Sequence, residues 1–137
     1  PLSWAHFING NGTETCNLYR KHFRPSFEHS DPVVSVGVNV LCAESEREAA
    51  LMLESLERWR KDGLRGPIPK AVNEESQSSV TVLSPSRPMV VGTPEIVYEQ
   101  LLFVANAYQA EELLIVTICH DHEQRKNSYR LIAEQFQ

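Results

Sequence analysis

The stretch VVSVGVNVLC, residues 33–42, decides the fold class of this chain. It is rich in β-branched residues and lacks the strict polar alternation of a strand that has one face in water. It therefore predicts a strand that is covered on both faces, which is typical of parallel sheets. A second run of this kind, LLIVTIC at 113–119, and a shorter apolar run at 2–8 predict two further strands.

Helices are expected after the first two strands. The Asn-Gly-Asn-Gly turn at 9–12 follows the first strand, and its glycines are expected to form the turn rather than to cradle a phosphate. Thr13 is then expected to cap a helix that ends before Pro25. After the second strand, Ser45 and Glu48 form a capping-box pattern, and the helix behind them is expected to end at Gly63.

Residues 64–92 concentrate Pro, Ser and Gly around one short β-like piece at 80–83, which predicts a loop-rich excursion. A helix is expected to begin at Thr93 and to run to about residue 109, and a last helix is expected to begin behind Asp121 as its N-cap. Strand and helix alternate three times, so the predicted fold class is α/β. We expect the three strands to lie side by side in chain order, parallel, with right-handed helical crossovers.

Composition argues against several classes of function. The 137 residues carry a net charge of −5 and give a pI near 5.5, so no basic face is expected for nucleic acid or for an anionic membrane. The apolar runs are too short to span a bilayer and no leader pattern opens the chain, which predicts a cytoplasmic protein. Three cysteines without close pairing predict neither a disulfide framework nor a zinc knuckle.

Candidate ligand contacts lie at the ends of the predicted strands, because the loops at the C-terminal ends of parallel strands carry the ligand-contacting residues in such folds. These places are the stretch 4–7, with Trp4, His6 and Phe7, then 39–42, which begins at Asn39, and then 117–122. An aromatic ring beside a histidine suits stacking on a planar ring and hydrogen bonding to an oxygen atom. The alternative is that Trp4 and Phe7 belong to the core and that His6 is a satisfied histidine.

The His120-Asp121-His122 cluster could in principle bind a metal or transfer protons. Alternate side chains on a tight loop diverge, and no third ligand with zinc-like spacing is visible, so no metal site is predicted. Asp121 is expected to cap the last helix, with Glu123 in its first turn. The two histidines are then left as candidate contacts of a substrate or a flavin.

Four blocks of the sequence resemble consecutive parts of luciferase-like, flavin-dependent monooxygenases. They are LYRKHFRPS (18–26), PVVSVGVNVLCAESEREA (32–49), VGTPEIV (91–97) and DHEQRKNSYRLIAEQF (121–136). The resemblance implies the last three βα units of a TIM barrel, with PLSWAHF similar to the sixth strand, VVSVGVNVL to the seventh and LLIVTICHDH to the eighth. A complete barrel needs eight such units and about 250 residues, so we expect a fragment or the product of a truncated gene.

The same resemblance implies a chemistry in which reduced FMN and molecular oxygen oxidise a small organic substrate, with a flavin reductase as a possible partner. It implies that His6, which falls closest to a tryptophan of the luciferases, is catalytic. The residues it implies for flavin contact are Trp4, His6, Phe7 and Thr117, and those for substrate contact are Asn39, His120 and His122. Because five barrel strands are missing, the isolated chain is expected to be inactive and to bind FMN weakly or not at all.

Two other interpretations remain open. The chain could be a non-catalytic α/β module that self-associates or binds a partner through open strand edges, or an unrelated small α/β binding domain. The first and third strands each lose a neighbour and carry no lysine, proline or bulge that would protect an edge. We therefore expect a homo-oligomer, or dependence on a chain that supplies the missing barrel strands, rather than a stable monomer.

Overall fold

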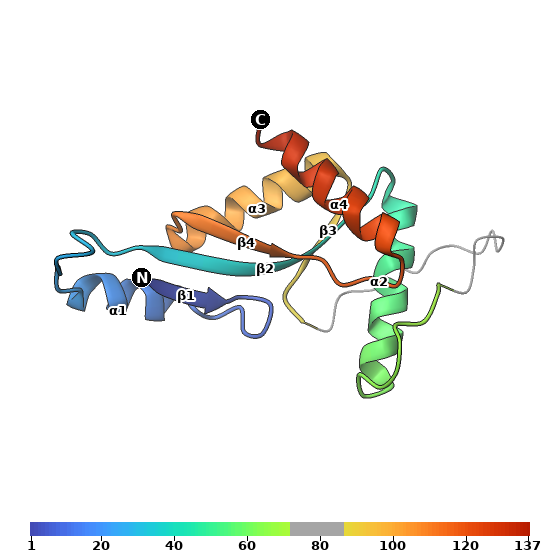
Figure 1. The fold of residues 1–137 in the computed structure, drawn as a ribbon, viewed down its shortest axis with the longest axis horizontal. Helices are drawn as coiled ribbons and strands as arrows, with labels where there is room; N and C mark the ends of the chain where they lie inside the picture. The colour runs from blue at the N-terminus through green and yellow to red at the C-terminus, as the bar shows by residue number, and fades with distance from the viewer. Residues whose placement is uncertain (72–86) are drawn as a thin grey trace.

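The computed structural model describes residues 1–71 and 87–137, so the β-like piece expected at 80–83 lies outside the described residues. Four strands and four helices alternate along the described chain, and Figure 1 shows the long strand β2 at the centre of the molecule. The elements are β1 (Leu2–Ala5), α1 (Thr13–His22), β2 (Val34–Cys42), α2 (Glu46–Lys61), β3 (Val90–Gly92), α3 (Pro94–Tyr108), β4 (Glu112–Val116) and α4 (His122–Gln135).

All four strands belong to one parallel sheet. β1, β3 and β4 each pair in parallel with β2, and in the described residues β1 and β4 have no other strand neighbour. The prediction of an α/β fold with three parallel strands in the order β1, β2, β4 is confirmed. The handedness of the crossovers stays a prediction.

Hydrogen bonds show which edge of β2 each neighbour takes. The carbonyl of Gly37 accepts from the amide of Phe7, just after β1, at 3.4 Å. The amide of Ala43 donates to the carbonyl of Gly92 in β3 at 3.1 Å. The carbonyl of Val34 accepts instead from the amide of Glu111, just before β4, at 3.0 Å. Alternate residues of a strand direct their amide and carbonyl groups to the same edge. β1 and β3 therefore share one edge of β2, and β4 takes the other.

The sequence-based element boundaries need three corrections. Residues 90–92 form strand β3 although they were expected within the loop-rich segment 64–92, because three residues are too few to show a period. β1 ends at Ala5 rather than at residue 8, since the amides of Ile8 and Asn9 both fold back to the Ala5 carbonyl. β4 ends at Val116 rather than at residue 119.

The helix caps were predicted with one error. Ser45 Oγ accepts from the amide of Glu48 at 3.3 Å, Gly63 adopts a φ of +73° after α2, and Asp121 accepts from the amide of Gln124 at 2.8 Å. Thr13, however, is already the first residue of α1, and Gly12 precedes it as an N-cap that offers no side chain. The cap signals at Ser45 and Asp121 therefore specified where α2 and α4 begin.

The core has two parts that follow the two faces of β2, which is buried along its whole length. One face, called here the helix face, packs against α1, α3 and α4 through a cluster that contains Val34, Val36, Val38, Val40, Val97, Leu101 and Ile132. The second cluster joins the end of β2 to α2 through Leu41, Ala43, Ala49, Met52, Leu53 and Leu56. In the described ranges, no helix combines the length and apolar character needed to cross a bilayer.

Candidate functional site

His6 lies in the turn that follows β1. Its Nδ1 atom is 3.0 Å from the hydroxyl of Tyr108, and the two rings meet edge to face with centroids 5.5 Å apart. Burial lowers the pKa of His6 below its ordinary value of 6.5, so the ring is neutral at neutral pH. A neutral imidazole can donate from one nitrogen and accept at the other, which suits contact with an oxygen atom of a ligand.

Tyr108, at the end of α3, was not singled out from the sequence. Its side chain is buried, with 2% exposure. Its hydroxyl donates to the carbonyl of Gly10 at 2.8 Å and accepts from the amide of Gly12 at 3.2 Å. Burial raises the pKa of the Tyr108 phenol, so it stays protonated. The signal in the sequence was a tyrosine within an apolar helix. Such a tyrosine is expected to be buried, and a buried tyrosine hydroxyl needs hydrogen-bond partners.

Trp4 and Phe7 lie on opposite faces of the sheet. Trp4 is in register with Val36 on the helix face, and its indole N–H donates to the carbonyl of Asn9 at 2.8 Å. Phe7 covers the other face, because a Cβ atom added to Gly37 would come within 3.0 Å of the Phe7 ring. This placement favours the core role for Trp4 and leaves Phe7 facing the side that α3 and α4 do not cover.

Asn39 projects from β2 on the same face as Gly37, two residues further along the strand. It is 2% exposed, and its Oδ1 atom finds no hydrogen-bond partner among the residues that the structure describes. An unpaired buried acceptor costs about 1–3 kcal/mol, so such atoms call for an explanation. Asn39 therefore offers an acceptor for a donor supplied from outside the described chain.

Thr117 is buried just after β4 and bonds within the fold. Its hydroxyl donates to the carbonyl of Val40 at 2.9 Å, and its amide donates to the hydroxyl of Tyr129 at 2.9 Å. The bond to Val40 extends the contact between β4 and β2 beyond the last regular residue of β4, and the bond to Tyr129 joins this point to α4. They favour a supporting role for Thr117.

His120, in the loop after β4, and His122, the first residue of α4, have different partners. His120 Nδ1 bonds to the carbonyl of Ile68, whereas His122 Nδ1 accepts from the guanidinium of Arg125 at 2.7 Å. Asp121 between them caps α4, and the amide of Gln124 holds the pKa of its carboxyl below the usual range. Within residues 1–71 and 87–137, no three His, Cys, Asp or Glu side chains gather in a way that could hold a metal ion.

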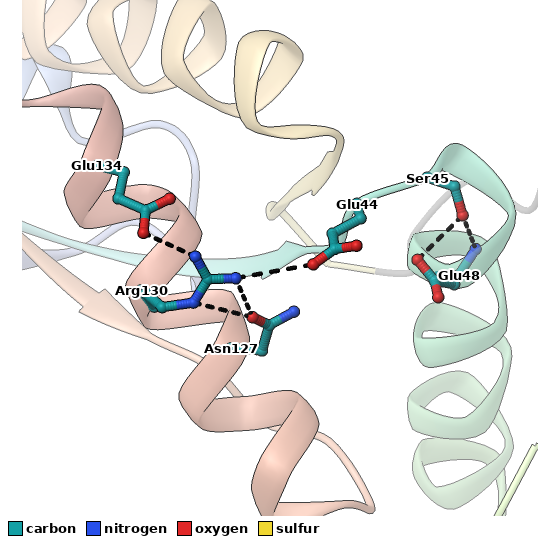
Figure 2. Close-up of polar contacts among 6 residues, drawn as sticks. All are labelled: Glu44, Ser45, Glu48, Asn127, Arg130 and Glu134. Carbon is teal, nitrogen blue, oxygen red and sulfur yellow. Dashed lines mark hydrogen bonds and ion pairs between the residues drawn. The ribbon is translucent and has the colours of Figure 1, made fainter.

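A small cavity of about 150 Å³ lies at the C-terminal end of β2, between the start of α2 and α4. Carboxylates line it, from Glu44 and Glu48, together with Asn127. Figure 2 shows Arg130 in contact with two of the lining residues: its guanidinium reaches Asn127 at 2.6 Å and Glu44 at 3.7 Å. The negative lining disfavours a phosphate group, and the Arg130 contacts join α4 to the loop after β2.

The predicted site residues form separate groups rather than one cluster. His6 lies with Tyr108 near the helix face, and Phe7 lies on the Gly37 side of the sheet with Asn39. His120 and His122 have their own partners on other elements. No hydrogen bond or ring contact joins these groups within the described ranges, so a ligand that used all of them would have to bridge them.

Comparison with known proteins extends this description. No family model matches the chain. The uncharacterized protein YwcH of Bacillus subtilis is 38% identical over 97% of this chain and 43% of its own length. A luciferase-like monooxygenase of Escherichia coli K12 is 24% identical over 98% of this chain and 43% of its own length. The crystal structure of apo-MsnO8 superposes with a TM-score of 0.79 and 31% identity, covering 99% of this chain and 44% of that one.

The chain thus spans less than half the length of the relatives it matches, which is consistent with part of a barrel. Each match covers nearly the whole chain, so the similarity does not depend on one motif. The chain is similar over nearly its whole length to a segment that makes up about 43% of proteins named luciferase-like monooxygenases.

Proposed function

We propose that this chain is the C-terminal segment of an FMN-dependent luciferase-like monooxygenase, an oxidoreductase that oxidises a small organic substrate with reduced flavin and O2. The observation that carries the proposal is the similarity to two Escherichia coli luciferase-like monooxygenases over 98% of the chain. We also propose a cytoplasmic location and a flavin reductase as the source of reduced flavin.

The residues on the Gly37 side of the sheet suit a planar ring. Phe7 offers an aromatic face there, and Asn39 offers a buried acceptor without a partner in the described chain. When bound, reduced FMN would supply the electrons for the reaction with oxygen. The protein's own contribution is to orient the reactants and to exclude water.

The placements favour flavin contact for Phe7 and hydrogen bonding of the substrate for Asn39. The family resemblance favours catalysis and flavin contact for His6. Trp4 and Thr117 support these positions, because Trp4 lies on the helix face and Thr117 bonds to the backbone of β2.

His120 and His122 are assigned to the rim of the site. Both side chains are exposed, and each uses its Nδ1 atom in a contact within the chain. The Nε2 atoms are then the ones available to a substrate.

The isolated chain should bind FMN weakly, because the barrel strands that it does not share with its relatives would carry most of the flavin contacts. Fluorescence quenching of FMN on titration with the purified chain measures this affinity. A dissociation constant in the millimolar range or no binding is expected. Micromolar or tighter binding would mean that the cofactor site lies within these residues.

A second candidate function is assembly through open edges. A groove of about 330 Å³ lies beside β4 between α3 and α4, lined by apolar side chains that include Leu101, Leu113 and Phe136. Phe103 of α3 is 75% exposed, and Leu114 projects from the opposite face of β4 and is 46% exposed. The edge of β4 and this apolar surface suit a second copy, or a chain that supplies the missing strands.

Sedimentation across a dilution series tests the assembly. We expect an oligomer that dissociates on dilution. We expect Leu114→Lys to shift the mass toward the monomer, because it places a charge on the open edge strand β4. Leu18→Lys is the matched control, since Leu18 is 51% exposed but lies on α1. A well-folded monomer at low micromolar concentration would contradict the assembly proposal.

A further inference from the structure

We propose that Tyr108 is a positioning residue that holds His6 in the tautomer protonated at Nδ1 and leaves Nε2 as the free acceptor. The use of this tautomer in catalysis rests on the proposed function, in which His6 is catalytic. The tautomer itself is a property of the chain and can be measured without flavin or substrate.

The hydrogen bonds of the Tyr108 hydroxyl carry the argument. Three hydrogen-bond contacts meet at its oxygen: the Gly10 carbonyl at 2.8 Å, His6 Nδ1 at 3.0 Å and the Gly12 amide at 3.2 Å. The Gly12 amide can only donate, and the Gly10 carbonyl can only accept. The single phenol proton therefore goes to Gly10, since otherwise two oxygen atoms would face each other at 2.8 Å with no proton between them.

With the phenol proton placed on Gly10, the contact to His6 is a hydrogen bond only if Nδ1 carries a proton. In the neutral ring Nε2 is then unprotonated. Nε2 makes no hydrogen bond to any residue of the described ranges. It can accept a hydrogen bond from a bound hydroxyl or N–H group, or take up a proton.

The loop between β1 and α1 is built to bring its backbone to this hydroxyl. A Cβ atom added to Gly12 would lie 2.1 Å from the Trp4 indole, and one added to Gly10 would lie 3.3 Å from Pro88 and 3.6 Å from the His6 ring. A side chain at Gly12 would therefore displace the indole or the loop, whereas one at Gly10 would need Pro88 to move only slightly. Burial of Tyr108, which keeps its phenol protonated, preserves the arrangement through neutral pH.

Nitrogen NMR of the ¹⁵N-histidine-labelled chain tests the proposal, because protonated and unprotonated ring nitrogens have well-separated chemical shifts. The chain has five histidines, and the signals that vanish in His6→Asn belong to His6. We expect a protonated Nδ1 and an unprotonated Nε2 at neutral pH. In Tyr108→Phe the acceptor for Nδ1–H is lost, so the His6 ring should shift toward the tautomer protonated at Nε2.

Tyr98→Phe is the matched control, because Tyr98 is on the same helix and its ring packs against Phe136 instead. It should leave the His6 signals unchanged. A His6 protonated at Nε2 in the unaltered chain would overturn the proposal, and so would a folded Tyr108→Phe variant with an unchanged tautomer.

If Tyr108→Phe does not fold, a second measurement on the unaltered chain decides. A nuclear Overhauser effect between the Nδ1 proton and the Tyr108 ring protons is expected, and its absence in a chain that shows both signals would overturn the proposal. The flavin function fails separately: a longer protein containing this chain that lacked FMN-dependent oxidation would refute that function and leave the tautomer standing.

Discussion

Gly12→Ala is the substitution that tests the placement of Trp4 most directly. The added Cβ atom would lie 2.1 Å, 2.2 Å and 2.5 Å from three atoms of the Trp4 indole. Ordinary carbon contacts are about 3.5–4.0 Å, so the indole would have to retreat by well over an ångström. Gly12 has a φ of −84° and a ψ of −6°, which alanine adopts without strain, so the expected penalty is steric.

The magnitude follows from three contributions. Forcing a methyl group into a packed site costs about 1–3 kcal/mol. Loss of the hydrogen bond from the Trp4 indole to the Asn9 carbonyl adds about 0.5–1.5 kcal/mol. The lower entropy of an unfolded chain with alanine in place of glycine offsets about 0.4–1 kcal/mol. We therefore expect Gly12→Ala to lower the free energy of unfolding by about 2 kcal/mol.

Urea unfolding followed by circular dichroism at a fixed protein concentration measures this change, since fluorescence would report the moved indole itself. In a Trp4→Ala background the indole is gone, so Gly12→Ala should cost much less. Gly10→Ala is the control from the same loop, because its Cβ would meet Pro88 rather than Trp4. An equal cost of Gly12→Ala in both backgrounds would refute the contact between the Trp4 indole and Gly12.

Two further substitutions test the ends of α4 and β2. Asp121→Ala should lower the free energy of unfolding at neutral pH. The difference from the unaltered chain should fade as the pH falls through the depressed pKa of Asp121, because the unaltered carboxylate then also loses its charged hydrogen bond to the Gln124 amide. Asp121→Asn should show no such pH dependence in urea titrations. Ser128→Ala should cost about 1–3 kcal/mol by the same assay, because Ser128 Oγ accepts from the buried amide of Cys42, whereas Ser30→Ala at an exposed position should change little.

Local signals were sufficient for the elements that carry most of the fold. β2 could be predicted because its β-branched residues are apolar on both faces, and both faces are in fact buried. Ser45 and Asp121 could be predicted as caps because a cap hydrogen bond spans only three residues. The fold class followed from the alternation of these elements.

The faces of the candidate site could not be read from the sequence. His6 and Phe7 were selected because they follow a strand, but β1 ends earlier than its apolar run, and the turn then directs neighbouring side chains to different sides. A period of two in the sequence cannot report this, because the turn breaks the period. The role of Trp4 likewise depended on where α1 and its preceding loop came to lie.

The sequence by itself determined that this chain forms parallel strands separated by capped helices, since those features depend on residues within a few positions of one another. Only the tertiary structure decided that β3 pairs with the same edge of β2 as β1 does, further along the strand. It also decided that Tyr108 contacts His6, which lies 102 residues earlier in the chain. A three-residue strand and a hydroxyl's choice of partners have no local signature. They are stable only once the sheet and α3 have brought distant backbone and side-chain groups within hydrogen-bonding distance.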